Sequence, residues 1–321
     1  MAKHHVNQHF VSKSYLSAWC DPTAPADHEP YVWVFPVEGG APRKRPPSKI
    51  YRIPEMYTKI VSGPDGKQHR DLRLEYYCKR IEDDFLRARN NYLNLQKPLP
   101  ASSIVQVLAY VALQQCRTPR ARDEVRAQGA HALALMDDFA RGVANMSELD
   151  RRKMADPPRF RNGPGMRREQ VAQLVAEPLQ RTILQTVRIV TPLLAKLSFA
   201  VLVSTSNNLF ITCDEPCVWY DPEAHKRPPL FRAPALRYPS IEITLPISPR
   251  AMLLLTKKPV EGYLEAPSDL VRAINRRTRA FAEESFVSAS PEADPFWYVR
   301  GEEPGQSQSG PSAVPSDANP S

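Results

Sequence analysis

The chain has 321 residues, of which 42% are apolar, so it is long enough to bury a substantial core. Its 43 lysines and arginines outnumber 35 aspartates and glutamates, and the resulting formal charge of +8 favours anionic partners. No apolar stretch is both long and uncharged enough to span a bilayer, and five irregularly spaced cysteines argue against a disulfide framework. We therefore expect a cytoplasmic protein with no membrane partner.

The first half of the chain alternates short extended segments with helices. Apolar spacing and turn residues predict, in chain order, a short helix or extended segment at 9–19, a strand at 31–37, a proline-rich loop at 42–49 and an amphipathic helix at 75–94. A further helix starts with Ser102 or Ser103 as its N-cap and runs to Pro119. Because a proline there removes a helical hydrogen bond, we expect a kink or a restart, with the helix continuing to Asn145.

The pattern changes near residue 199. A helical pattern at 169–200, interrupted by Pro178 and Pro192, is followed by runs rich in β-branched and aromatic residues. These runs predict a hairpin of 199–204 with 209–213, further strands at 217–220, 241–246, 252–256 and 286–289, and a helix at 268–283.

This order predicts an α+β fold with a mostly antiparallel sheet in the C-terminal third. We expect a single domain over residues 1–300, helical at about 70–198 and with its sheet at about 199–300. Residues 301–321 lack lysine, arginine and aromatic residues, which predicts a disordered tail.

The segment from Arg151 to Arg168 carries seven basic residues against the single acid Asp156, together with prolines and glycines. Such a basic loop is a candidate contact for nucleic acid or another anionic ligand. It also fits a solvated connection between two helices, which is the commoner role of a basic run.

Gln114 and Arg117 are three residues apart in a predicted helix and share a face that points partly inward. A guanidinium can grip a carboxylate or phosphate through two hydrogen bonds, and the Gln114 amide offers one acceptor and two donors. An inward arginine equally fits a buried salt bridge that fixes helix packing, so both interpretations stay open.

Glu75 and Glu82 are seven residues apart, which places them on the same side of one helix. Two carboxylates so placed can bind a divalent metal, accept Arg117 or form a solvated flank.

Asp214 ends a predicted strand, where functional side chains often lie, but it also fits a turn before Pro216. His9 lies beside Phe10 and Val11. It is the best candidate for proton transfer, although a histidine in this context is more often a hydrogen-bonded core residue.

Four short motifs carry a family resemblance: His9-Phe10-Val11 with Tyr15-Leu16, Gln114 with Arg117-Thr118-Pro119, Phe210-Ile211-Thr212 with Asp214, and Pro246-Ile247-Ser248-Pro249. With Asn275, this ordered set resembles the microbial domain-of-unknown-function family numbered four-two-three-eight. The resemblance implies positions for polar residues and no established activity. Ser12 stands where the family usually has proline, and Glu215 stands where asparagine is common.

Two hypotheses follow for function. The first is a metal-dependent phosphoester hydrolase acting on a phosphate-containing or nucleic-acid substrate, with magnesium or manganese as cofactor. Its catalytic candidates are His9, Gln114, Arg117 and Asp214, and its metal ligands are Glu75, Glu82 and Asp214. The second is a nucleic-acid or protein-binding module without catalysis, in which the same polar residues form a structural network.

Overall fold

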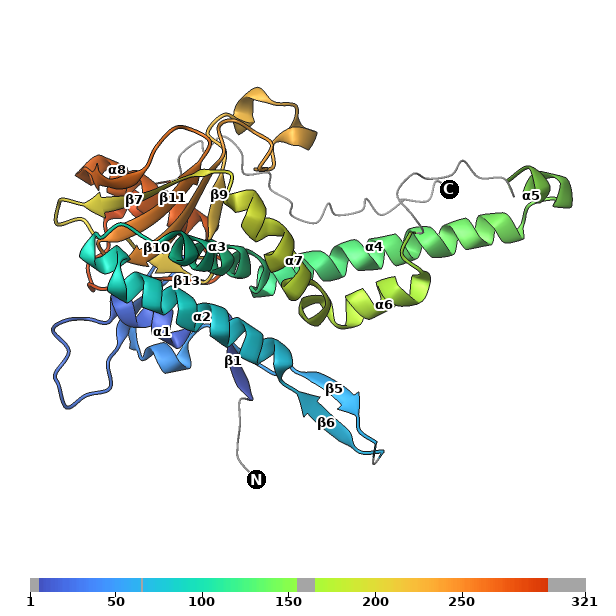
Figure 1. Cartoon of the computed structure of the whole chain (residues 1–321), viewed down its shortest axis with the longest axis horizontal. Coiled ribbons are helices and arrows are strands. Elements are labelled where there is room, and N and C mark those ends of the chain that lie inside the picture. Colours follow the sequence, from blue (N-terminus) through green and yellow to red (C-terminus); the bar gives the residue numbers. More distant parts are fainter. Residues whose placement is uncertain (1–5, 65, 155–164, 300–321) are drawn as a thin grey trace, which may run out of the picture.

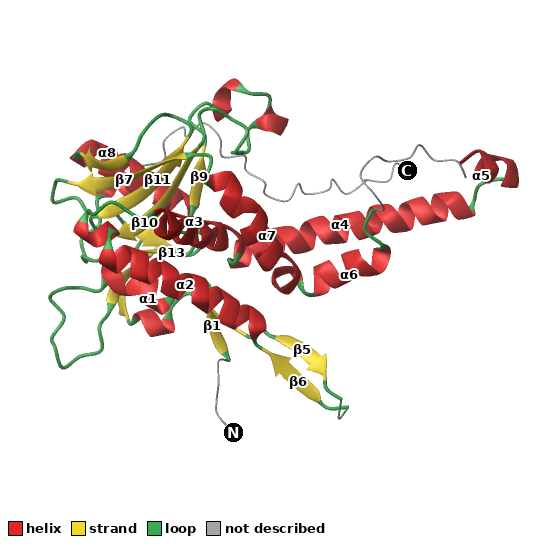
Figure 2. Ribbon diagram, viewed as in Figure 1, coloured by secondary structure: helices red, strands yellow, loops and turns green. Residues whose placement is uncertain are grey.

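A computed structural model describes residues 6–64, 66–154 and 165–299 (Figure 1). Helices and mostly antiparallel sheets make the fold α+β, as predicted (Figure 2). The molecule has a body of packed sheets and helices and an arm of helices α4, α5 and α6 that extends away from the body (Figure 1). In the described ranges no helix is long and apolar enough to cross a membrane.

The largest sheet has five strands in the order β12-β7-β11-β10-β9. Their bounds are β7 (Ser198–Ser204), β9 (Val218–Tyr220), β10 (Glu242–Ser248), β11 (Ala251–Thr256) and β12 (Gly262–Ala266). All pairs are antiparallel except β12 with β7. Neighbouring residues of a strand point to opposite faces. Val201 accordingly joins the main core, and Leu202 packs in a second cluster with Val271 and Ile274 of α8 (Ser268–Phe281).

A second sheet of four strands corrects two of our predictions. Its order is β3-β2-β13-β8, with bounds β3 (Arg43–Arg45), β2 (Val32–Pro36), β13 (Ser285–Ser288) and β8 (Thr212–Cys213). The sheet structure is therefore not confined to the C-terminal third. The predicted hairpin is also wrong, because β8 pairs with β13 and β7 pairs with β11 and β12 in the other sheet.

Two small antiparallel pairs lie outside these sheets, β1 (Asn7–His9) with β4 (Arg52–Pro54) and β5 (Lys59–Ser62) with β6 (Gln68–Asp71). The sequence pattern predicted none of them, because each strand has only three or four residues. The β1–β4 pair fixes the N-terminal segment against the body and so places His9 and Gln8.

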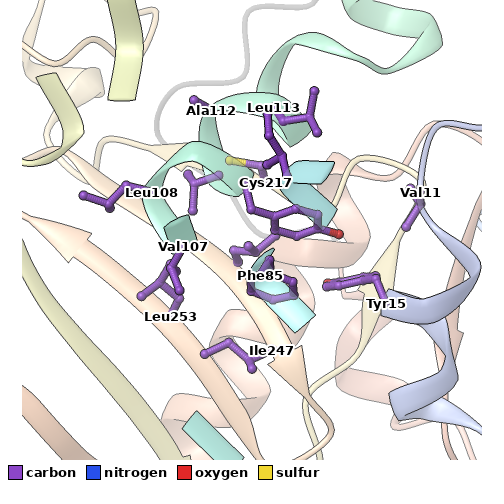
Figure 3. Packing of buried hydrophobic residues seen from close by; sticks show 14 of the residues in the cluster. Val11, Tyr15, Phe85, Val107, Leu108, Ala112, Leu113, Cys217, Ile247 and Leu253 are labelled. Carbon is purple, nitrogen blue, oxygen red and sulfur yellow. The ribbon is translucent and has the colours of Figure 1, made fainter. Parts of the chain in front are cut away.

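The main core joins helices to the five-stranded sheet (Figure 3). The helices of the body are α1 (Lys13–Leu16), α2 (Arg73–Asn91), α3 (Ala101–Cys116) and α7 (Pro178–Leu194). Phe85 of α2 stacks on Tyr110 of α3, with ring centroids 4.0 Å apart. Tyr15 of α1 lies against both rings, so the N-terminal segment is part of the core. Helix α3 begins after Pro100, and neither Ser102 nor Ser103 is its N-cap.

The arm starts where α3 ends. Helix α4 (Pro119–Ala144) carries α5 (Glu148–Met154) near its far end, and α6 (Arg168–Ala176) lies alongside it (Figure 1). The predicted restart at Pro119 is confirmed, and the predicted break at Pro178 separates α6 from α7. The predicted interruption at Pro192 is wrong, because Pro192 lies inside α7 near its end. The predicted tail and residues 155–164 of the basic segment lie outside the described residues.

Candidate functional site

A cavity of about 650 Å³ lies between the N-terminal segment, helix α2 and the end of α3. Its principal polar lining residues are Gln8, His9, Ser12, Glu75, Glu82 and Arg117. Four of the predicted site residues, His9, Glu75, Glu82 and Arg117, therefore line one cavity although up to 108 positions separate them in sequence.

Arg117 is the central donor of the hydrogen-bond network beside the cavity. It caps α3 with φ −107° and ψ 0°, and Thr118 then caps α4 by accepting a hydrogen bond from the Ala121 N–H at 3.3 Å. The Arg117 guanidinium donates to the carboxylate of Glu82, to the carbonyl oxygen of His9 and, over 3.1 Å, to the Tyr57 hydroxyl. Only 2% of the residue is exposed. Burial opposes its charge, but Tyr57 and Glu82 raise its pKa well above the ordinary value, so it stays charged.

Gln8 joins the N-terminal segment to α2. Its amide nitrogen donates to the Glu75 carboxylate at 2.6 Å and to the Thr58 hydroxyl at 2.9 Å, and its amide oxygen accepts from the Tyr57 N–H at 2.6 Å. Both predicted carboxylates of α2 are thus held by a residue from elsewhere in the chain, one by Gln8 and the other by Arg117. Such polar contacts between distant segments fix one packing arrangement.

His9 lines the same cavity and is half-buried. Burial lowers its pKa, as do Arg52 and Arg117, while the carbonyl groups of Pro47 and Ser48 raise it. The ring is therefore neutral at neutral pH. Its Nε2 atom has no hydrogen-bond partner among the described residues.

Gln114 lies in the core and does not line the cavity. It is 1% exposed, and neither its amide nitrogen nor its amide oxygen has a hydrogen-bond partner in the described part of the chain. It follows Tyr110 by one helical turn and precedes Arg117 by three residues. Gln114 is not among the cavity-lining residues, so the predicted pairing of Gln114 with Arg117 in one site is not seen.

Asp214 and Asn275 lie apart from the cavity and bind backbone. The Asp214 carboxylate accepts from the N–H groups of Glu283, Glu284 and Ser285 at 2.7–3.1 Å. The Asn275 amide accepts from the Ile211 N–H at 3.1 Å and donates to the Leu209 carbonyl at 2.7 Å. Both side chains position the connections around β8.

The described residues do not bring the three proposed metal ligands together at one centre. Across the described residues, no group of three or more histidine, cysteine, aspartate or glutamate side chains is arranged to hold a metal ion. The physical reason is that each predicted ligand is engaged elsewhere, Glu75 by Gln8, Glu82 by Arg117 and Asp214 by three backbone N–H groups. Glu75 and Glu82 line the cavity and Asp214 does not, so the metal site with magnesium or manganese stays a prediction that these contacts do not support.

The cavity also offers no activated thiol. Burial raises the pKa of Cys78 to about 12, so this thiol stays protonated at neutral pH and is a poor nucleophile. Ser12 uses its hydroxyl to accept from the Tyr15 N–H at 3.3 Å and thereby caps α1. The family's usual proline at this position lacks a side-chain oxygen for such a cap.

Sequence analysis missed Gln8, Tyr57 and Lys13 as lining residues. Gln8 gave one available signal, since it is the last polar residue before the His9-Phe10-Val11 motif. Tyr57 gave none, because its place depends on the β1–β4 pairing of segments more than 40 residues apart.

The basic segment contributes little described structure. Arg151, Arg152 and Lys153 are exposed on α5, and Arg168 is paired with Asp137 of α4 at 2.7 Å. The predicted anionic partner of this segment stays a prediction.

The comparison with known proteins agrees with the motifs. A family model described as "Protein of unknown function (DUF4238)" matches residues 7–293. No curated protein and no solved structure matches the chain. The chain belongs to the DUF4238 family, and the matched range contains both the cavity and the arm.

Proposed function

We propose that the protein binds a small polar molecule in the cavity between β1, α2 and the end of α3. The observation that carries this proposal is the convergence of separate sequence motifs on one cavity of about 650 Å³. This volume is within the range of roughly 300–1,000 Å³ that is usual for small-molecule sites. The Arg117 network supports the proposal, because it joins the elements that line the cavity and so holds their arrangement.

The charges of the lining favour one class of ligand. Three acidic side chains, Glu75, Glu82 and Asp83, face three basic ones, Lys13, Lys79 and Arg117, so the lining is neutral as a whole. A polyphosphate or a nucleic-acid backbone needs an excess of cations. The balance instead favours a neutral or zwitterionic molecule that forms hydrogen bonds with serine hydroxyls and amide groups.

The binding proposal is tested by blocking the cavity. Ser14 lines it, and Ser14→Phe would fill part of its volume without removing a member of the Arg117 network. We expect small molecules that co-purify with the wild type, identified by mass spectrometry of the denatured protein, to be lost in Ser14→Phe. Ser102→Phe, an exposed position of α3 outside the cavity, is the matched control and should retain them.

The same ligands should raise the thermal midpoint of the wild type and of Ser102→Phe, because binding stabilises only the folded state. If the wild type carries no small molecule and a panel of amino acids, nucleosides and sugars leaves its midpoint unchanged, the binding proposal is wrong.

Hydrolysis at the same cavity is a second candidate. Its support is the neutral imidazole of His9, which lines the cavity and whose buried Nε2 atom has no hydrogen-bond partner among the described residues, so that it is the group able to take up a proton. A test uses p-nitrophenyl phosphate and p-nitrophenyl acetate as probes. Turnover should fall at least about 100-fold in His9→Gln. The exposed His131→Gln on α4 should match the wild type, and a wild type without turnover of either probe would remove this candidate.

A further inference from the structure

Helix α4 is long and only partly covered by other described elements. It has 26 residues, and Gly129 is the one residue of it that is buried in the described structure. Helices in proteins owe most of their stability to an apolar face that packs against other elements. A helix with so little cover has a face that another element should occupy.

The apolar residues of α4 follow a regular repeat, which we call the seam. Steps of four and three residues alternate through Val125, Gly129, Ala132, Met136, Phe139 and Val143, and Met146 continues this spacing just past the end of the helix. This spacing keeps one stripe of a helix facing a second helix and is the pattern of coiled-coil pairing. The seam therefore predicts a helical partner along its whole length.

Helix α6 covers the first part of the seam. A Cβ atom placed on Gly129 would lie 2.7 Å from the Val175 side chain, so only glycine allows this approach. At the other end of α6, Arg168 pairs with Asp137 at 2.7 Å, which shows that the two helices run antiparallel. The cover by α6 extends to about the level of Asp137.

Among the described residues, little covers the seam beyond Asp137. Phe139 is 63% exposed, and Val143, one turn further along the helix, is only partly buried. The adjacent charges are already paired, Asp138 with Arg141 and Asp137 with Arg168. This part of the arm is therefore apolar and locally neutral, unlike the chain as a whole with its charge of +8.

We propose that α4 of a second copy of this chain packs on the open part of the seam and forms a two-fold dimer. The α4–α6 contact already uses this stripe for helix pairing, and a dimer continues it over Phe139 and Val143. A second α4 supplies the same four-and-three spacing, which the opposing stripe requires. Paired flanking charges allow two positively charged chains to meet here without like-charge repulsion.

The experiment is analytical ultracentrifugation of the full chain from 0.5 to 100 μM. We expect a concentration-dependent dimer for the wild type, and a Phe139→Glu variant that stays monomeric, with a dissociation constant raised by roughly 100-fold or more because a charge enters the apolar contact. Ala134→Glu adds the same charge on the opposite, exposed side of α4 and should dimerise like the wild type. Circular dichroism at low concentration should give both variants the helix content of the wild type.

Two results would overturn the proposal. One is a wild type that is monomeric at 100 μM. The other is a Phe139→Glu variant that dimerises as strongly as the wild type, which would place the interface on another surface.

Discussion

Different contacts hold two helical regions of the molecule. One is the wall of the cavity, by which we mean the part of α2 and the end of α3 that line it, and the other is the arm. In the wall, Arg117 bonds to groups 35 and 108 positions away in the sequence. In the arm, most ion pairs join residues one to four positions apart, such as Arg122 with Asp123 and Arg141 with Asp138. The wall therefore exists only in the packed fold, whereas much of the arm is stabilised by local contacts. Substitutions that are chemically alike should accordingly have very different effects in the two regions.

A large difference in the free energy of unfolding is expected between two leucine substitutions, one in the core and one on the arm. Leu108 of α3 is 2% exposed in the core, and Leu149 of α5 is 65% exposed on the arm. Leu108→Ala should lower the free energy of unfolding by about 3 kcal/mol through lost burial and a residual cavity. Leu149→Ala should change it by less than about 0.5 kcal/mol. Urea titration followed by circular dichroism measures both free energies of unfolding, and equal losses would contradict the distinction between the packed body and the arm.

Two arginines give the next contrast. Arg117→Ala leaves the Glu82 carboxylate and the His9 carbonyl without their donor, which should cost about 3 kcal/mol of unfolding free energy. Arg126→Ala removes an exposed pair with Asp123 at 3.4 Å and should cost less than about 0.5 kcal/mol. An Arg117→Ala protein with wild-type stability would show that the network does not hold the wall together.

Glu215 provides a pH test at the junction of the two regions. Burial and the nearby charge of Asp214 raise the pKa of Glu215 from 4.5 to about 8, although a hydrogen bond with Thr118 and the charge of Arg120 act in the opposite direction. The folded protein thus keeps a proton that the unfolded chain releases above about pH 4.5. The stability that this group contributes is complete below that pH and is lost as the pH rises through about 8.

Glu215→Gln cannot ionise, so its stability relative to the wild type should increase between pH 5 and pH 8.5, by up to about 4 kcal/mol. Urea unfolding at the two pH values measures the difference. Glu124→Gln, an exposed position on α4, should show no such increase. A Glu215→Gln difference that does not depend on pH would disprove the shifted titration.

The smallest expected effect concerns the start of the arm. Thr118→Ala removes the side-chain cap of α4 and should cost about 1 kcal/mol. Thr118→Ser keeps a hydroxyl oxygen and should retain most of that stability. Thermal unfolding of the two variants checks the prediction, and an equal loss in both would assign the effect to the lost methyl group.

Local pattern predicted the longer elements of the fold well. Helical spacing located α2, α3 and α4, and the proline at 119 located the restart. The pairing partners of the strands were harder to predict. Thr212 of β8 pairs with Val287 of β13, and nothing in the local sequence distinguishes this pairing from a hairpin with β7. Short strands such as β1 and β4 carry too few residues for periodicity to be visible.

Four lining residues of the candidate site, His9, Glu75, Glu82 and Arg117, were predictable from the sequence, but most of their hydrogen bonds were not. Burying the charge of Arg117 beside an apolar stripe is costly without a partner. The sequence therefore indicates a carboxylate partner, and Glu82 was one of the candidates. The sequence has no signal that the amide of Gln8 holds Glu75 or that Asp214 binds backbone, because these bonds depend on where distant segments meet. For this reason the metal site was predicted from residues that are individually suitable but never share a centre.

The junction at Arg117, Thr118 and Pro119 has a mechanical consequence. These three consecutive residues end a core helix, anchor the guanidinium in the cavity wall and begin α4. At 1.5 Å per residue, the 26 residues of α4 form a lever of about 39 Å. A tilt of about 5° at this pivot would displace the tip by about 3 Å, so small adjustments around a bound molecule would be magnified at the far end of the arm.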